Sequence, residues 1–332
     1  MKTEVLIVDV NTPDSDSISR AGKLLREGQL VAFPTETVYG LGANALDSTA
    51  VARIFEAKGR PSFNPVIVHV ADVEAAKLLA AEWPDSAKRL AERFWPGPIT
   101  FVVKKAANVP DIVTAGGPTV GIRIPAHPVA LALMKAAGVP VAAPSANRST
   151  ELSPTRAEHV LKGLSGRISV VVDGGPTTGG IESTVLDLSQ EIPRLLRPGL
   201  ISAQQIEEVI GPITRLEHSE SGDSPLPSPG LMRRHYSPQA KVEMVNDSGR
   251  QRVEELIVNG ESVGWMPLGD SLVPGVENRP MPSSPDAYAV QLYSTLHALD
   301  EVGVSWIIIQ RPPNEPEWLA VIDRLTRAAS DE

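Results

Sequence analysis

The chain lacks cysteine: none of its 332 residues is one. This absence excludes disulfides, thiolate nucleophiles and every zinc or iron–sulfur site built from cysteine. Positive charge is not in excess either, since the formal net charge is −9 at pH 7. A chain of this charge is not expected to bind nucleic acid over a broad basic surface, although a local basic patch is compatible with it.

Long apolar runs are also missing. No stretch approaches the ~20 apolar residues of a membrane-spanning helix, and the segment from Val5 to Val10 is too short for a signal peptide and contains Asp9. The content of hydrophobic residues, 42%, and of charged residues, 21%, is typical of a globular chain. We therefore expect a cytoplasmic protein without membrane contact, long enough for two domains.

Several familiar catalytic motifs are absent. There is no Walker A phosphate loop and no GxSxG nucleophile elbow, and the six histidines show no zinc-ligand spacing. The segment from Gly40 to Ala45 matches a dinucleotide-binding fingerprint loosely. It does not directly join a strand to a helix, and no acidic residue follows at the expected ~20 positions, so we reject that interpretation.

The chain does contain an alternation of strand-like and helix-like segments over residues 1–210, which predicts an α/β domain. Residues 211–240 are rich in proline, serine and glycine and predict a linker. From residue 241 to 332 the alternation resumes and predicts a small βαβ-type domain with a mostly parallel sheet. Within these regions Asp47, Ser153 and Ser202 are predicted to start helices as capping residues.

The predicted linker is longer than the ~12–15 residues of an ordinary structureless connection. It contains a basic and aromatic cluster from Met232 to Tyr236. Such a cluster is compatible with a segment that docks as a lid over a site. It is equally compatible with a disordered tether, and composition alone weighs the two evenly.

The stretch from Phe33 to Val70 concentrates polar residues. A strand end leads into a loop of hydroxyls, a carboxylate and two glycines, and the next helix ends in a Lys-Gly-Arg-Pro sequence at residues 58–61. Lys58 and Arg60 would suit a phosphate or carboxylate ligand. Cations near a helix C-terminus also complement its macrodipole, and for these two residues alone that explanation is favoured. The polar loop upstream makes the ligand-binding explanation nearly as strong as the macrodipole explanation, but does not decide between them.

Two further loops, at residues 144–147 and 173–184, follow predicted strands, where open α/β folds place their ligands. Their small hydroxyl and amide side chains, with glycines, suit anion binding through backbone N–H groups, although ordinary turns use the same residues. Arg123 and Arg197 add two cations on or beside strands, where a cation needs a partner or a ligand. Three such loops and four cations, without a nucleophile, favour binding and activation of a small anion over covalent catalysis.

Four motifs stand in the chain in this order: Phe33-Pro34-Thr35-Glu36-Thr37-Val38-Tyr39-Gly40-Leu41, Lys58-Gly59-Arg60-Pro61, Trp95-Pro96-Gly97-Pro98-Ile99-Thr100 and Pro144-Ser145-Ala146-Asn147. They resemble the YrdC-type threonylcarbamoyl-AMP synthases, and the match covers residues 1–210. The proline-rich linker and the α/β tail resemble the long, two-domain form of that family. This form implies a twisted YrdC-like α/β domain followed by a small Rossmann-like domain.

The resemblance implies a nucleotidyltransferase reaction in which L-threonine, bicarbonate and ATP, with Mg²⁺, give threonylcarbamoyl-adenylate and pyrophosphate. The product would pass to a downstream tRNA threonylcarbamoyl-transferase complex, for threonylcarbamoyladenosine formation in tRNAs that read ANN codons. Such a step needs positioning and charge neutralisation rather than a protein nucleophile, in agreement with the residues described above.

The resemblance also implies site residues. Those expected to hold ATP are Lys58, Arg60, Thr119, Ser145, Asn147, Ser153, Arg197, His235 and Tyr236, with Lys58 and Arg60 as the catalytic pair. Those expected to hold threonine are Thr35, His69, Arg123 and Ser183, with Arg123 pairing the threonine carboxylate. His235 and Tyr236 would close the linker over the substrates and exclude water from a labile acyl-adenylate.

Three other functions compete with this one. A protein that binds double-stranded RNA or tRNA on a concave basic surface is disfavoured by the net charge, and a steep salt dependence of RNA binding would favour it. A hydrogenase-maturation carbamoyltransferase, which also has a YrdC-type domain, carries cysteine zinc fingers that this chain lacks. A purely structural module leaves the three ligand-type loops unexplained.

Overall fold

Two β-sheets organise the computed structural model, which describes residues 2–215, 236–246 and 249–329. Within these residues the larger sheet has eleven strands in the order β1-β8-β2-β3-β7-β4-β6-β5-β9-β10-β11, and the smaller has four in the order β12-β15-β13-β14. Pairing in the larger sheet is mixed, whereas each pair in the smaller sheet is parallel. The expected mixed α/β fold and the mostly parallel second sheet are confirmed, while a Rossmann-like likeness of the second region stays a prediction.

The strands of the larger sheet are β1 (Glu4–Ile7), β2 (Val31–Phe33), β3 (Gly40–Asn44), β4 (Val68–His69), β5 (Ile99–Lys104), β6 (Thr119–Arg123), β7 (Val141–Ala142), β8 (Val170–Asp173), β9 (Thr184–Asp187), β10 (Arg194–Arg197) and β11 (Thr214–Arg215). Those of the smaller sheet are β12 (Lys241–Val245), β13 (Val263–Met266), β14 (Glu277–Asn278) and β15 (Trp306–Gln310). We call residues 2–215 the larger lobe and residues 241–329, as far as they are described, the smaller lobe.

The helices of the larger lobe are α1 (Ser15–Arg26), α2 (Ser48–Lys58), α3 (Val73–Lys77), α4 (Asp85–Phe94), α5 (Asp111–Thr114), α6 (Pro128–Ala137), α7 (Ala157–Leu164) and α8 (Ala203–Ile210). Those of the smaller lobe are α9 (Arg250–Val258), α10 (Pro285–Val302), the 3₁₀ turn η1 (Pro316–Trp318) and α11 (Leu319–Ala328). Across the described ranges, none of these helices combines the length and the apolar character needed to cross a membrane.

Local signals fix the ends of some of these helices. Asp47 caps α2 by accepting hydrogen bonds from two backbone N–H groups of its first turn, and Gly59 ends it in the left-handed region at φ 62°. Ser202 caps α8 through a capping box with Gln205. The predicted caps at Asp47 and Ser202 are therefore confirmed.

The predicted cap at Ser153 is wrong. Helix α7 starts at Ala157, and the fully buried Ser153 donates its hydroxyl to the carboxylate of Glu182 instead. The hydroxyl forms a charge-assisted hydrogen bond to a buried carboxylate 29 residues along the chain, a contact that the local capping pattern does not reveal.

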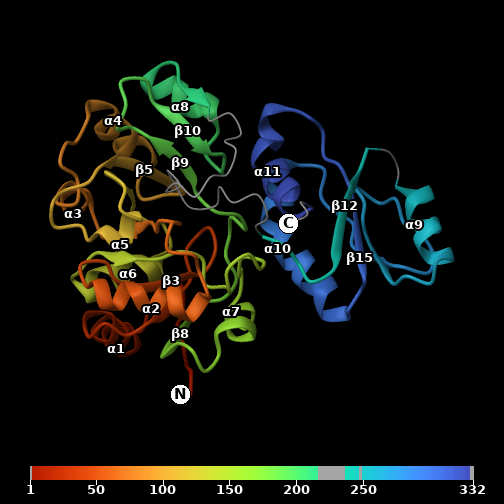
Figure 1. The fold of residues 1–332 in the computed structure, drawn as a ribbon, viewed down its shortest axis with the longest axis horizontal. Coiled ribbons are helices and arrows are strands. Elements are labelled where there is room, and N and C mark those ends of the chain that lie inside the picture. Colours follow the sequence, from red (N-terminus) through yellow and green to blue (C-terminus); the bar gives the residue numbers. More distant parts are fainter. Residues whose placement is uncertain (1, 216–235, 247–248, 330–332) are drawn as a thin grey trace.

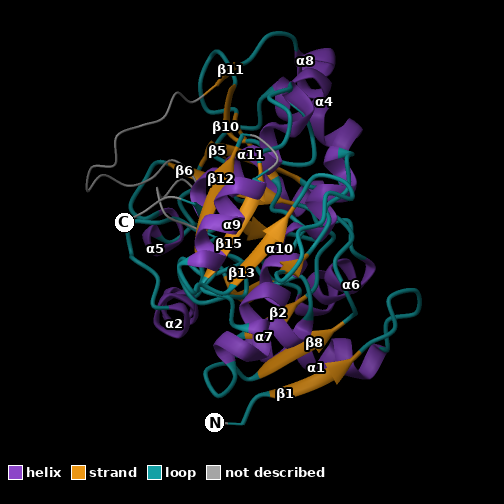
Figure 2. Cartoon of the chain, turned by 90° about the vertical axis from the view of Figure 1, so that its right-hand side faces the viewer, coloured by secondary structure: helices purple, strands orange, loops and turns teal. Residues whose placement is uncertain are grey.

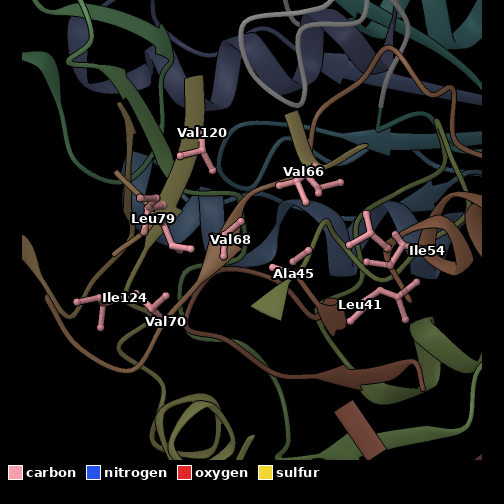
Figure 3. Close-up of a cluster of buried hydrophobic side chains, with 14 of the residues drawn as sticks. Leu41, Ala45, Ile54, Val66, Val68, Val70, Leu79, Val120 and Ile124 are labelled. Carbon is pink, nitrogen blue, oxygen red and sulfur yellow. The ribbon is translucent and has the colours of Figure 1, made fainter. Parts of the chain in front are cut away.

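A group of buried apolar side chains lies against the larger sheet. Leu41, Val68 and Val120 come from three of its strands, and Ile54 packs onto them from α2 (Figure 3). Each apolar side chain removed from water contributes at roughly 25 cal/mol per Å². This packing holds the carboxyl ends of β4 and β6, and the loop after β2, in fixed positions.

The smaller sheet is covered on both faces. Ile307 and Ile309 pack with residues of α10 and α11, whereas Ile308 packs with residues of α9. This alternation along β15 is typical of a strand buried between two layers. Figure 1 shows α10 and α11 on the side that faces the larger lobe, and α9 on the far side.

The two lobes share an apolar core. Val38, Leu152 and Ile181 of the larger lobe are buried together with residues of α10 and α11. At Gly180, where φ is 75°, an added Cβ would lie 2.2 Å from the carbonyl oxygen of Ala289 on α10, so main chain meets main chain there. In Figure 2 the smaller sheet lies in front of the larger lobe, whose edge strands β1 and β11 are at opposite ends.

Candidate active site

A cavity of about 50 Å³, which we call the first cavity, lies at the carboxyl ends of several strands of the larger sheet. Side chains at or beyond the ends of β2, β4, β6, β7 and β10 line it, together with the residue before β9 and the segment that leads into β12. Of the residues predicted for the site, those that line it are Thr35, Arg60, His69, Arg123, Ser145, Ser183, Arg197 and Tyr236.

Arg123 gives the first cavity a fixed positive charge. The parallel pairing of β4 with β6 places it beside His69. Its Nε donates to the Gly97 carbonyl oxygen at 3.2 Å, and its Nη1 donates to Thr37 Oγ1 at 3.0 Å. Its Nη2 lies 2.6 Å from Glu36 Oε1, and Glu36 is not a lining residue, so the pair turns its cation to the cavity.

The hydroxyls of the loop after β2 form a directed chain. Arg123 can only donate, so Thr37 Oγ1 accepts from it and donates to Thr35 Oγ1, 2.8 Å away. Thr35 then donates to the Val38 carbonyl oxygen at 2.7 Å. Both threonine hydroxyls are thereby oriented by the arginine.

His69 is a neutral member of the wall. Burial and, after it, the charge of Arg123 lower the pKa of His69 to about 3. At pH 7 its imidazole is therefore uncharged, and its buried Nδ1 has no hydrogen-bond partner among the residues that the structure describes. A buried nitrogen without a hydrogen-bond partner, on a side chain that lines a cavity, is a candidate ligand contact.

Two further guanidinium groups are oriented by carbonyl oxygens, which do not neutralise them. Arg60 Nη2 donates to Asn64 Oδ1 at 2.6 Å and to the Pro65 carbonyl oxygen at 2.7 Å. Burial lowers the pKa of Arg60 to about 10, so it stays charged at neutral pH. Arg197 donates from Nε and Nη2 to the Ser183 carbonyl oxygen at 3.2 and 3.0 Å. The first cavity thus presents cations to an anionic ligand.

Lys58 and Asn147 lie behind the wall. Lys58 Nζ donates to the carbonyl oxygens of Ser145, at 2.7 Å, and of Asn147. Burial, and then the charge of Arg60, lower the pKa of Lys58 well below its usual range. In this structure Lys58 shapes the loop that carries Ser145, and a direct contact of Lys58 or Asn147 with ATP stays a prediction.

A second cavity of about 440 Å³ adjoins the first at Ile67, which lines both. Thr119 belongs to this second cavity, together with Gly121 and Val185. Its volume lies within the ~300–1,000 Å³ of small-molecule sites. The structure therefore separates Thr119 from the other residues that were predicted to hold ATP.

The remaining predicted residues differ in how they can be placed. Ser153 is buried behind the first cavity, against Glu182, and Tyr236 is a buried wall residue. His235 lies outside the described residues.

Sequence reasoning did not single out Thr37 or Glu182, which line the first cavity. Thr37 was available from the pattern, because it stands two positions after Thr35 in the hydroxyl loop. Glu182 was one acid in a long polar segment, without a distinguishing signal.

Comparison with known proteins bears on this arrangement. Residues 23–199 match the family profile described as Telomere recombination, and residues 201–330 match that described as the C-terminal domain of threonylcarbamoyl-AMP synthase. The first match alone covers more than half of the chain. The chain belongs to the YrdC-type threonylcarbamoyl-AMP synthase family, in the long, two-domain form that the sequence predicted.

Curated relatives extend over nearly the whole chain. The threonylcarbamoyl-AMP synthase of Pyrococcus abyssi is 45% identical over 318 residues, which are 93% of each chain. That of Bacillus subtilis is 44% identical over 342 residues, covering 99% of this chain and 98% of the relative. A crystal structure of the Pyrococcus abyssi protein complexed with L-threonine matches with a TM-score of 0.92 at 43% identity, over 98% of each chain.

Proposed function

We propose that this chain is a nucleotidyltransferase that makes threonylcarbamoyl-AMP and pyrophosphate from L-threonine, bicarbonate and ATP. The observation that carries the proposal is the first cavity, where the guanidinium groups of Arg60, Arg123 and Arg197 meet oriented hydroxyls. Family membership and the L-threonine complex of the relative support it. Residues 1–210 act as the catalytic domain, 211–240 as the linker and 241–332 as the C-terminal domain.

Threonine binds at the Arg123 side of the first cavity. Arg123 pairs the carboxylate, and the hydroxyls of Thr35 and Ser183 contact the polar groups of the amino acid. His69 adds a hydrogen bond without a second charge, because its pKa of about 3 keeps it neutral. Because the imidazole is neutral, it also does not repel the threonine amine when that amine is protonated.

ATP spans both cavities. Arg60, Arg197 and the Ser145 loop hold the triphosphate in the first cavity, and Lys58 and Asn147 fix that loop from behind. The nucleoside occupies the second cavity, where Thr119 is a polar contact and Ile67 is a wall residue shared with the first cavity. Ser153 acts through Glu182, whereas His235 and Tyr236 cover the bound substrates.

The chemistry needs no covalent enzyme intermediate. The threonine amine takes up the carbon of bicarbonate with loss of water, and an oxygen of the resulting carbamate attacks the α-phosphorus of ATP. The new P–O bond forms as the bond to pyrophosphate breaks. Both partners are anionic, so the guanidinium groups lower the barrier by neutralising charge and fixing the approach. Buried walls exclude water that would hydrolyse the product.

Mg²⁺, which the family implies, has no protein-built site among the residues that the structure describes. Among the described residues, no group of three or more histidine, aspartate or glutamate side chains is arranged to hold a metal ion. The metal would arrive with the triphosphate, and no step above depends on it.

The product passes to a tRNA threonylcarbamoyl-transferase complex in the cytoplasm. Direct binding of tRNA or double-stranded RNA is the weaker alternative, given the net charge of −9.

The decisive experiment measures pyrophosphate release from ATP while threonine and bicarbonate are each omitted in turn. Release that requires both is expected. Release that needs neither, or no release under any condition, would contradict the proposed function. RNA binding over a salt series addresses the alternative, which a steep salt dependence would favour.

A further inference from the structure

One acidic side chain lines the cavity that we assign to two anionic substrates. Glu182 is 6% exposed and directly precedes Ser183. An uncompensated carboxylate there would repel a triphosphate and a threonine carboxylate, and burial strengthens such repulsion. The charge of Glu182 has to be compensated if the first cavity is to admit these ligands.

The compensation comes from the smaller lobe. Arg324 of α11 donates from Nε to Glu182 Oε2 at 2.7 Å, and the Tyr293 hydroxyl of α10 donates to the same oxygen at 3.2 Å. The other oxygen accepts from Ser153 Oγ. Burial raises the pKa of Glu182, but Arg324 and then Arg197 outweigh it, so the pKa lies below its usual range. Arg324 is 1% exposed and does not line the cavity, so it acts from behind the wall.

The same guanidinium supports Tyr236, a second wall residue. Arg324 Cζ lies 5.4 Å from the centroid of the Tyr236 ring, and the Tyr293 ring packs against it at 5.7 Å. The Tyr236 hydroxyl lies 3.5 Å from Nη1 of Arg197. The φ of Tyr236 is 63°, a region that bulky residues seldom adopt, so neighbouring contacts must hold this conformation.

We propose that Arg324 is a positioning residue of the active site, supplied by the smaller lobe, which neutralises Glu182 so that the first cavity accepts two anions. The identity of these anions rests on the proposed function. Asp323 lies 2.6 Å from Arg324 Nη1 and keeps the guanidinium paired if Glu182 is made neutral. The charge of Glu182 can therefore be removed without leaving Arg324 uncompensated.

The test measures binding of ATP, and of uncharged adenosine, to the full chain by calorimetry without threonine or bicarbonate. Arg324→Gln should raise the Kd for ATP at least about tenfold, because it leaves a buried carboxylate unpaired. The Kd for adenosine should stay within about twofold, since the nucleoside carries no charge. Glu182→Gln should bind ATP at least as tightly as the unmodified chain. The double variant should return to within about threefold of it, because a neutral side chain needs no cation.

Arg327→Gln is the matched control. Arg327 stands on the same helix and pairs with Asp323 at 3.1 Å, so its loss tests α11 without touching the cavity. It should leave the Kd for ATP unchanged.

Unchanged ATP affinity in Arg324→Gln, or a double variant as weak as Arg324→Gln alone, would overturn the proposal. If Arg324→Gln does not fold, Glu182→Gln decides: retained affinity supports the proposal and a tenfold loss refutes it. ATP binding that depends on Arg324 in a chain that releases no pyrophosphate would reject the proposed function and leave this inference standing.

Discussion

Two largely buried glutamate–arginine pairs flank the first cavity and face it in opposite senses. In one pair Arg123 lines the cavity with Glu36 behind it, and in the other Glu182 lines the cavity with Arg324 behind it. Their separations are nearly equal, at 2.6 and 2.7 Å. The difference teaches that the charge of a pocket depends on which member of each ion pair forms its wall.

The pairs also differ in origin. Glu36 and Arg123 both belong to the larger lobe, whereas Glu182 and Arg324 are 142 residues apart and join the lobes. Removing one member of either pair leaves a buried charge at a cost of roughly 3–5 kcal/mol. Ligand binding should respond differently, because Arg123 lines the first cavity whereas Arg324 does not.

Among variants of these two pairs, Arg123→Ala is expected to have the largest effect on the KM for threonine. The variant removes the cation that we propose to pair the threonine carboxylate, so the KM for threonine should rise about 100-fold or more, as loss of a charge-assisted pair implies. Steady-state pyrophosphate release over a threonine series measures it. Arg20→Ala is the control, because Arg20 forms an exposed pair with Glu4 that contributes little. An unchanged KM would mean that Arg123 serves only the fold.

A smaller effect is expected from Glu36→Gln. The neutral side chain no longer shares the charge of Arg123, so the KM for threonine should fall about two- to fivefold. The same assay measures it, and a thermal unfolding scan checks that the variant is folded. A tenfold rise in KM would instead show that Glu36 orients Arg123, and the two pairs would then be alike in function.

The smallest effect concerns acid stability at the contact between the lobes. His159 of α7 stacks on His297 of α10 with ring centroids 3.8 Å apart. Burial first, then Arg156 and Lys162, lower the pKa of His159 to about 4, and burial first, then His159, lower that of His297 to about 3. Between pH 6.5 and these lowered values, both histidines therefore bind protons in the unfolded chain but not in the folded chain.

The sign of the pH effect follows from these values. The stability that the two neutral histidines contribute is fully present above the unfolded pKa of about 6.5 and is lost as pH falls toward 4 and 3. The Tm of the double variant His159→Gln/His297→Gln should fall less steeply over this range than that of the unmodified chain. If the Tm of the double variant and that of the unmodified chain fall equally steeply with pH, the two histidines are not the cause of the acid sensitivity.

Local patterns predicted much of this fold because the responsible contacts are short in sequence. Asp47, Gly59 and Ser202 each act within a few residues, and the structure confirms the helix ends that they predict. The motifs also pointed to most of the first cavity, since strand ends bring Thr35, Arg123 and other predicted residues together.

Contacts between distant segments were not predictable in the same way. Ser153 has the local signature of a cap, yet its hydroxyl goes to Glu182 because both are buried at the contact of the lobes. Arg324 stands in an ordinary amphipathic helix, where a cation is expected to face solvent. Only the packing of α11 against the larger lobe turns it inward, and no spacing in the sequence encodes that contact.

Gly180 has a consequence for how such proteins can be recombined. Its main chain lies so close to α10 that an added Cβ would approach the Ala289 carbonyl oxygen to 2.2 Å and the Val290 Cα to 2.5 Å. A chimera that joins this larger lobe to another relative's smaller lobe is therefore viable only if residue 180 stays glycine and the incoming helix keeps the same main-chain path. The two lobes are therefore expected to be exchangeable between relatives only as a matched pair.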